Sequence, residues 1–328
     1  MECMIGRRVG PQHYPTKYKV EKILGCGSFA SVYQARICDG RYLPSRLRAI
    51  KMINLEGLQT VQDEIERHKQ RVQQEVDIHK HLQDEYIIRF FESFEFENQM
   101  CIVMEHANGG NLHQNVLKFG CLPEISARLI FKQIYLALKY MHDEGFANMD
   151  VKMDNVLMIS STDVKLADFG LSKVLMDDGQ VKGACGTPEY MAPELLSAPN
   201  KAHDGKGTDV HSAGVLLHWM VVGAPPIQIP EEINVPNDRI RYIHGEQLKQ
   251  THITIPSESR HFHPFPGSRW MQRKFRLTPE IKHLLARMLE KDPQSRITME
   301  DIAAHPWMSI ELPVIYVPCG DGLTRNLR

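Results

Sequence analysis

Asp150-Val151-Lys152-Met153-Asp154-Asn155 is followed, thirteen positions after its last residue, by Asp168-Phe169-Gly170, and then by Ala192-Pro193-Glu194. An aspartate with an ordinary pKa of about 3.9 is ionised at neutral pH, so Asp150 can accept a proton from a hydroxyl group. Mg²⁺ prefers oxygen ligands, which Asp168 and the side-chain carbonyl of Asn155 offer. Lys152 can stabilise negative charge that develops beside this base. One tripeptide of this kind arises easily by chance, whereas three in this order indicate a catalytic site.

A glycine-rich stretch lies upstream, between two runs with strand composition. Residues 23–33 read Ile-Leu-Gly-Cys-Gly-Ser-Phe-Ala-Ser-Val-Tyr, and residues 48–51 read Arg-Ala-Ile-Lys. Glycine lets the backbone approach phosphate oxygens without an intervening side chain. Alone, such a loop is more often an ordinary hairpin, and a single lysine is more often a solvated surface charge. Their place before the catalytic motifs favours a phosphate site.

These motifs together resemble the phosphate-covering loop, catalytic loop and metal-binding loop of the eukaryotic protein kinases. The resemblance implies phosphoryl transfer from ATP, with Mg²⁺ as cofactor and a protein carrying a Ser or Thr acceptor as substrate. It makes Asp150 and Lys152 catalytic residues and Asn155 and Asp168 metal ligands. The residues that it assigns to the nucleotide site are Gly25, Gly27, Ser28, Val32, Ala49, Lys51, Glu75, Met104, Glu105, Ala107, Asn111 and Leu157.

Two of these assignments depend on expected elements. Val72, Val76, His79 and Leu82 recur at helical spacing within residues 62–82, and Glu75 lies on this helix 75 − 51 = 24 residues after Lys51. We therefore expect Glu75 to pair with that lysine, although several other acids share the polar face of the helix. In the resemblance, residues 104–111 form the hinge, where the backbone of Glu105 and Ala107 would bind adenine and Met104 would guard the rear pocket.

The expected fold is α+β, a bilobal kinase fold with a small, mostly β N-lobe carrying one regulatory helix and a larger, mostly α C-lobe. We expect a tail at 1–17, a kinase domain at 18–310 (N-lobe 18–104, hinge 105–110, C-lobe 111–310) and a second tail at 311–328. A chain of 328 residues has room for two such lobes. Further expectations are an apolar buried helix around 214–224, a helix starting at Thr278, and a Glu194–Arg296 ion pair implied by the family.

Composition limits the partners and the compartment. The net charge is 39 − 40 = −1, which suggests neither nucleic acid nor an anionic membrane as a partner. Seven scattered cysteines without C-x-x-C spacing favour free thiols in a reducing compartment. With no secretory signal, myristoylation site or long apolar stretch, the expected location is cytoplasmic, and nuclear or cytoskeletal association stays open.

The chain departs from the family pattern at Asn148-Met149, where His-Arg usually precedes the catalytic aspartate. Asn148 would stand beside His79, Phe90 and Phe169, so we expect looser packing there. The alternative function is therefore a pseudokinase that serves as a nucleotide-binding scaffold. A tyrosine kinase is disfavoured by Lys152 and by residues 186–189, Gly-Thr-Pro-Glu.

The activation segment, residues 173–186, contains no Ser, Thr or Tyr, and Met149 replaces the arginine that would receive a phosphate. We therefore expect activity without phosphorylation of this segment, which packing or an activating protein partner would hold in place. Asp154 suggests a mild preference for basic substrates. A finer resemblance, to the polo-like kinases of the centriole-duplication branch, depends on residues 25–30, 49–53 and 71–79 of the small lobe.

Overall fold

A computed structural model describes residues 4–14, 17–27, 30–38, 46–56, 62–233, 235–249, 253–257 and 276–309. The chain divides into two compact units, one formed by 1–114 with 136–181 and the other by 115–135 with 182–328. The first unit is built on a sheet, and the second is mostly helical. The grouping of 136–181 with the sheet differs from the expected lobes, and the limits of those lobes stay predictions.

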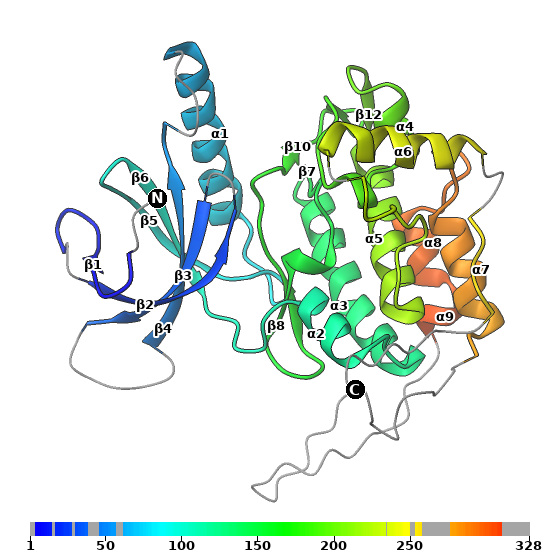
Figure 1. Cartoon of the computed structure of the whole chain (residues 1–328), viewed down its shortest axis with the longest axis horizontal. Helices are drawn as coiled ribbons and strands as arrows, with labels where there is room; N and C mark the ends of the chain where they lie inside the picture. Colours follow the sequence, from blue (N-terminus) through cyan, green and yellow to red (C-terminus); the bar gives the residue numbers. More distant parts are fainter. Residues whose placement is uncertain are drawn as a thin grey trace, which may run out of the picture. The chain divides into compact units, whose positions relative to one another are not determined.

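The first unit contains a six-stranded antiparallel sheet in the order β1-β2-β3-β4-β6-β5 (Figure 1). Its strands are β1 Arg8–Val9, β2 Tyr18–Cys26, β3 Ala30–Ile37, β4 Leu47–Asn54, β5 Phe90–Phe96 and β6 Gln99–Glu105. The turn between β5 and β6 places Glu97 and Asn98 at positive φ, which asparagine tolerates better than most residues. A tight hairpin therefore joins these two strands.

The two faces of the sheet bury different side chains because neighbouring residues of a strand point to opposite sides. On β4, Ile50 and Met52 belong to one buried cluster, whereas Ile53 belongs to another. Helix α1, Gln62–His81, covers the second face with Val72 and Val76, which confirms the expected helix. Its position fixes the side chains that it shares with the site.

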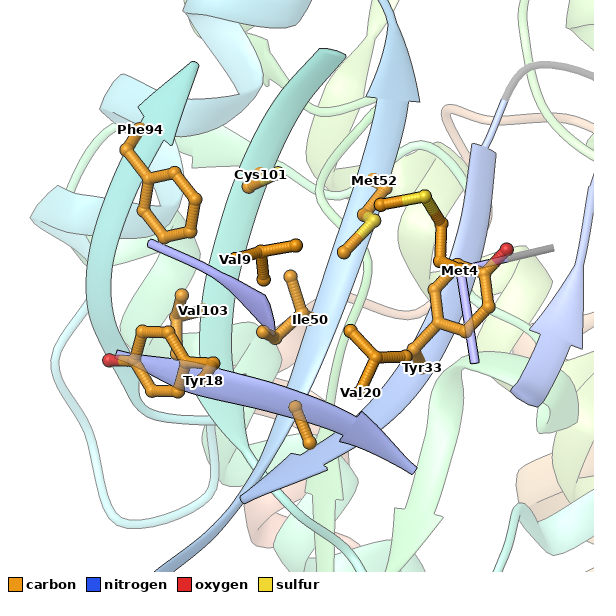
Figure 2. Close-up of a cluster of buried hydrophobic side chains, with 11 residues drawn as sticks. Met4, Val9, Tyr18, Val20, Tyr33, Ile50, Met52, Phe94, Cys101 and Val103 are labelled. Atoms are coloured by element: carbon orange, nitrogen blue, oxygen red, sulfur yellow. The ribbon is translucent and has the colours of Figure 1, made fainter. Parts of the chain in front are cut away.

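The other face of the sheet is covered by the N-terminal segment (Figure 2). Met4 and Val9 are 2% and 0% exposed and pack with Tyr18, Tyr33 and neighbouring strand residues. Strand β1 pairs with β2, and the Gly6 N–H donates to the Val20 carbonyl at 2.9 Å. The expectation of a tail at 1–17 is therefore wrong for residues 4–9. Two isolated apolar residues give no periodic signal, but they fill an otherwise exposed apolar face.

The remaining elements of the first unit are short strands around the catalytic motifs and parts of two helices. They are β7 Phe146–Ala147, the 3-10 helix η2 Met153–Asn155, β8 Val156–Met158, β9 Val164–Leu166, β10 Lys173–Val174, β11 Gln180–Lys182, α2 Leu112–Phe119 and α3 Glu124–Asp143, of which β11, α2 and α3 continue into the second unit. β8 pairs with β9, and β10 pairs with β7. These two pairings hold the catalytic loop between short ladders.

The second unit packs helices around α5, Gly205–Val222, whose residues are buried on nearly every side. The other elements of this unit are the helices η3 Pro188–Tyr190, α4 Pro193–Ser197, α6 Pro236–Lys249, α7 Pro279–Met288, α8 Met299–Ala304 and α9 Pro306–Ser309, and the short strand β12 Ala202–Asp204. Thr278 caps α7 by accepting the Ile281 N–H, as expected. The expected pair is also present, with Arg296 Nη1 2.6 Å from Glu194 Oε1.

Helix α5 corresponds to the apolar stretch expected to be a buried helix. Asp204 caps its first turn, and Gly223 ends it at φ 87°. At Gly214 a Cβ atom would lie 2.9 Å from the Met288 side chain, so α5 and α7 approach closely there. Among the described residues, no helix is both long and apolar enough to span a membrane.

Truncation of Met4 to alanine should destabilise the first unit. Removal of a buried methionine side chain costs about 2–5 kcal/mol, because transfer free energy is lost and a cavity remains. Met4→Ala should therefore lower the thermal unfolding midpoint measured by calorimetry. The matched control is Ile5→Ala, since Ile5 is 49% exposed. Equal midpoints for the two variants would contradict the packing of this segment against the sheet.

Candidate active site

A buried ammonium group joins three elements of the first unit. Lys51 Nζ, from β4, lies 2.7 Å from Glu75 Oε1 on α1 and 2.7 Å from Asp168 Oδ1 after β9. Glu75 is thus the carboxylate that pairs with this lysine, as the 24-residue spacing predicted. The Glu75 side chain is 9% exposed, whereas that of Asp168 is 45% exposed and open to the cleft.

The three charges shift one another's pKa values. Burial disfavours the charged form of Lys51, but Asp168 and Glu75 outweigh it and raise the lysine pKa. Burial raises the pKa of Glu75, and Lys51 offsets only part of this effect. For Asp168, burial acts against the charge, yet Lys51 holds the pKa below its ordinary value. Asp168 is therefore an ionised carboxylate at neutral pH, as a cation ligand must be.

The backbone after β9 is shaped for this carboxylate. Asp168 has φ 64°, in the left-handed region that non-glycine residues rarely adopt. The Gly170 N–H donates to Asp168 Oδ1 at 3.2 Å and so fixes the orientation of the side chain. A Cβ atom at Gly170 would lie 2.9 Å from Glu75 Oε2. A side chain there would press on the Glu75 carboxylate, which pairs with Lys51.

The catalytic loop is organised around Asp150, which is almost completely buried. Lys152 Nζ lies 2.7 Å from Asp150 Oδ2. Asn155 Nδ2 donates to the Asp150 carbonyl at 2.9 Å and to Asp150 Oδ2 at 3.1 Å. The amide nitrogen of Asn155 is thus directed at the base, which leaves its Oδ1 as the atom that could bind a cation.

Asn148 is an integral part of this loop, contrary to the expected loose packing. It is 0% exposed, and its Oδ1 accepts the Asp150 N–H at 3.1 Å. The aromatic contacts are made by His79, whose ring centroid lies 5.4 Å from that of Phe90 and 5.0 Å from that of Phe169. Asn148 therefore bonds to the backbone of Asp150, while His79 makes the ring contacts.

A cleft of about 410 Å³ opens in the first unit beside these groups. Predicted residues that line it are Gly25, Val32, Ala49, Lys51, Glu75, Met104, Glu105, Ala107, Asn111, Asn155, Leu157 and Asp168. Gly27, Asp150 and Lys152 are not part of its lining, and Ser28 lies outside the described residues. Lining residues that the sequence analysis did not single out include Lys22, Gln114 and Ala167. None of these belongs to a recognisable motif, and only the folded backbone brings them to the cleft.

The hinge side of the cleft suits a flat heterocycle. Ala49, Met104 and Ala167 form an apolar cluster there with Leu157 and Val32. Among the described residues, none makes a hydrogen bond to the N–H or C=O of Ala107, which lines the cleft. A nucleobase edge would satisfy such groups, so the residues present fit adenine.

Asn111 has a structural use that the sequence argument did not foresee. Its Oδ1 accepts the Gln114 N–H at 2.8 Å, while Gln114 Oε1 accepts the Asn111 N–H at 3.4 Å. These reciprocal bonds form a capping box at the start of α2. Asn111 still lines the cleft, so capping and ligand contact would share one residue.

The oxygen atoms of Asp168 and Asn155 also fit Mg²⁺. Mg²⁺ is usually held by one or two protein ligands together with phosphate oxygens and water. Two protein ligands are therefore enough for such a site. The described residues contain no group of three or more His, Cys, Asp or Glu side chains arranged to hold a metal ion.

Comparison with known proteins gives the family. A family model described as "Protein kinase domain" matches residues 18–308. The chain belongs to the protein kinase family. It is 33% identical over 298 residues to the SNF1-related protein kinase catalytic subunit alpha KIN12 of Arabidopsis thaliana, covering 90% of this chain and 52% of that protein. It is 33% identical over 314 residues to the serine/threonine-protein kinase SRK2F of the same plant, covering 94% and 79%.

A third plant relative is the CBL-interacting serine/threonine-protein kinase 14 of Arabidopsis thaliana, 32% identical over 295 residues, covering 89% of this chain and 58% of that protein. The kinase therefore spans about half the length of two of these relatives. Two of the three are named serine/threonine kinases, and together with the family match they confirm the serine/threonine class and the bilobal kinase fold. These relatives give no support to the finer resemblance to the polo-like kinases.

Protonation of His79 should destabilise this kinase in acid. Burial lowers the pKa of His79 to about 4, whereas an unfolded histidine titrates near 6.5. Between these values the unfolded state binds more protons, so stability is lost as the pH falls, by up to ~1.4 kcal/mol per pH unit. Denaturant titrations at several pH values should give a shallower dependence for His79→Leu than for the parent. Identical slopes would show that His79 is not buried neutral.

Proposed function

We propose that this chain transfers the γ-phosphate of ATP to serine or threonine hydroxyls of a protein substrate, with residues 18–310 as the catalytic domain. The observation that supports this most strongly is the Lys51 ammonium, 2.7 Å from both Glu75 and Asp168 at the edge of the cleft. The lysine, held between two carboxylates from separate elements, provides a fixed positive charge for phosphate. Asp168, one of the two carboxylates, provides an ionised ligand for Mg²⁺.

Each residue would then have a distinct role. Lys51 would orient the phosphates, and Asp168 with Asn155 Oδ1 would hold Mg²⁺, which neutralises phosphate charge when bound. Asp150 would accept the proton of the substrate hydroxyl, oriented by Asn155 and by the backbone bond to Asn148. Lys152, 2.7 Å from that base, would supply positive charge on the acceptor side. Gly25, Gly27 and Ser28 would cover the phosphates, and a Cβ atom at Gly25 would meet nothing within 4 Å, so its need for glycine would come from the ligand.

The pseudokinase alternative has no support from these contacts. Its basis was Asn148-Met149, yet Asn148 is buried and bonded to the catalytic loop. Met149 is also buried, and its backbone has a φ of 65°, which is strained for a residue other than glycine. The packed loop therefore holds a strained backbone conformation next to Asp150. An active serine/threonine kinase is therefore the function that we retain.

We further propose a cytoplasmic location and a regulatory protein partner. None of the five described cysteines forms a disulfide, which fits a reducing compartment. One relative is named for its interaction with CBL. For this chain we propose only that some protein regulates it.

The roles of the base and of the phosphate lysine should separate in kinetics. Asp150→Asn should lower kcat by ~10²–10⁴-fold while ATP affinity is retained, because Asp150 lies outside the cleft lining. Lys51→Met should lower activity at least ~100-fold through loss of a preorganised charge. Turnover of Mg-ATP and a mixed protein substrate, together with nucleotide titration, would measure both. Parent rates in both variants would overturn the proposed function.

The activation segment is tied to the catalytic loop by backbone bonds. β10 pairs with β7, and the Leu175 N–H donates to the Gly145 carbonyl at 2.8 Å. Ser172 Oγ donates to the Asn148 carbonyl at 3.2 Å. The following turn is closed by the Met176 N–H, which donates to the Gln180 carbonyl at 3.0 Å. These contacts support a segment that is ordered without phosphate.

Activity should therefore survive dephosphorylation. Purified kinase treated with a broad phosphatase should retain its parent rate, because residues 173–186 offer no phosphate acceptor and Met149 no phosphate-binding cation. Phosphate stoichiometry by mass spectrometry, measured with the rate, provides the check. Loss of activity on treatment would show that a phosphate elsewhere controls the kinase.

A further inference from the structure

A histidine pairs with an acidic side chain of the catalytic loop. His113 Nδ1 lies 3.1 Å from Asp154 Oδ1, and the two side chains are 25% and 45% exposed. His113 is the second residue of α2, and Asp154 belongs to η2 in the catalytic loop. The contact therefore links two elements that are 41 residues apart in the chain.

Both partners are carried by short, well-anchored elements. The capping box between Asn111 and Gln114 fixes the first turn of α2, where His113 lies. The loop that carries Asp154 is fixed by the bonds from Asn155 to Asp150. The His113–Asp154 contact is therefore part of a rigid arrangement, and neither partner is at the end of a long flexible loop.

Asp154 is placed where a substrate must pass. It is four residues after the proposed base, adjacent to the proposed metal ligand Asn155, and it lines the cleft. A peptide whose hydroxyl group reaches Asp150 has to run within side-chain reach of this loop. An exposed carboxylate at such a place would select for a cationic residue near the acceptor, unless another group already engages it.

We propose that His113 is a positioning residue for substrate selection, which holds Asp154 and thereby weakens selection for arginine or lysine beside the acceptor. This inference rests on the proposed kinase function and replaces the expected basic preference. Arginine binds carboxylate best through two parallel hydrogen bonds, one to each oxygen. Because His113 already bonds to Oδ1, an incoming guanidinium that pairs with both oxygens must share Oδ1 with the imidazole or displace it, which weakens the two-bond pairing.

The electrostatics around Asp154 agree with competition for a charged carboxylate. The hydrogen bond from His113, followed by the charges of His113 and Lys152, lowers the pKa of Asp154 although burial acts in the opposite direction. The carboxylate is thus charged with or without a substrate cation. Lys152 is itself held by Asp150 at 2.7 Å, so His113 is the neighbour that directly occupies an Asp154 oxygen.

The test is a set of Ser/Thr peptide libraries in which arginine, lysine or alanine is placed at each position beside the acceptor. With the full chain and Mg-ATP, the parent should show a nearly flat profile. His113→Ala should raise kcat/KM for arginine at one or two positions by roughly 3- to 10-fold, the range expected for one partly exposed charge pair. The gain should arise from a lower KM at unchanged kcat, and arginine should exceed lysine.

Three variants separate this role from a merely structural one. Asp154→Asn and the double variant His113→Ala, Asp154→Asn should both keep a flat profile. The matched control is His81→Ala, which removes a similar exposed pair, His81 with Glu144 at 2.8 Å, on α1. It should leave peptide selection unchanged.

Two results would overturn the inference. One is an arginine gain in the double variant, because the effect would then bypass Asp154. The other is an unchanged profile in His113→Ala at full activity, which would leave the kinase function intact. A parent that phosphorylates no peptide or protein would instead overturn the proposed function, and this inference with it.

Discussion

The Lys51 ammonium between Glu75 and Asp168 is the interaction on which the rest of the first unit depends. Isolated, a buried ammonium or carboxylate costs several kcal/mol in lost hydration, and the pairing offsets this cost only when the geometry is good. Here both distances are 2.7 Å. Because the partners come from β4, α1 and the turn after β9, all three elements must be in register for the charges to meet.

Hydrophobic burial sets that register. Ile53 on β4 and Val72 and Val76 on α1 share one cluster, so the apolar side of the helix determines which turn faces Lys51. Glu75 precedes Val76 and is buried with it, although its side chain is polar. Gly170 then permits the close approach of the turn that carries Asp168. Packing thus supplies the geometry, and the ion pair makes that geometry specific.

Sequence reasoning succeeded where residue types are fixed by chemistry at short range. Glu75 could be predicted because it lies on an expected helix, 24 residues after Lys51, where the family resemblance implies a carboxylate. Met4 and Val9 could not, since two scattered apolar residues do not indicate which sheet face they will cover. The His113–Asp154 pair was equally hidden, because it depends on how the chain returns to the cleft. The capping role of Asn111 is local and could have been predicted from the glutamine three residues later.

Asn148 shows how a departure from a family motif can preserve its geometry. Its side chain accepts the Asp150 N–H, and its carbonyl accepts the Ser172 hydroxyl, so one residue connects the proposed base with the start of the activation segment. The β7–β10 pairing lies next to this connection and adds backbone bonds that need no charge. A phosphate would order the same segment through electrostatic attraction to a cation. In this kinase, local hydrogen bonds that form with the fold itself connect the segment to the base.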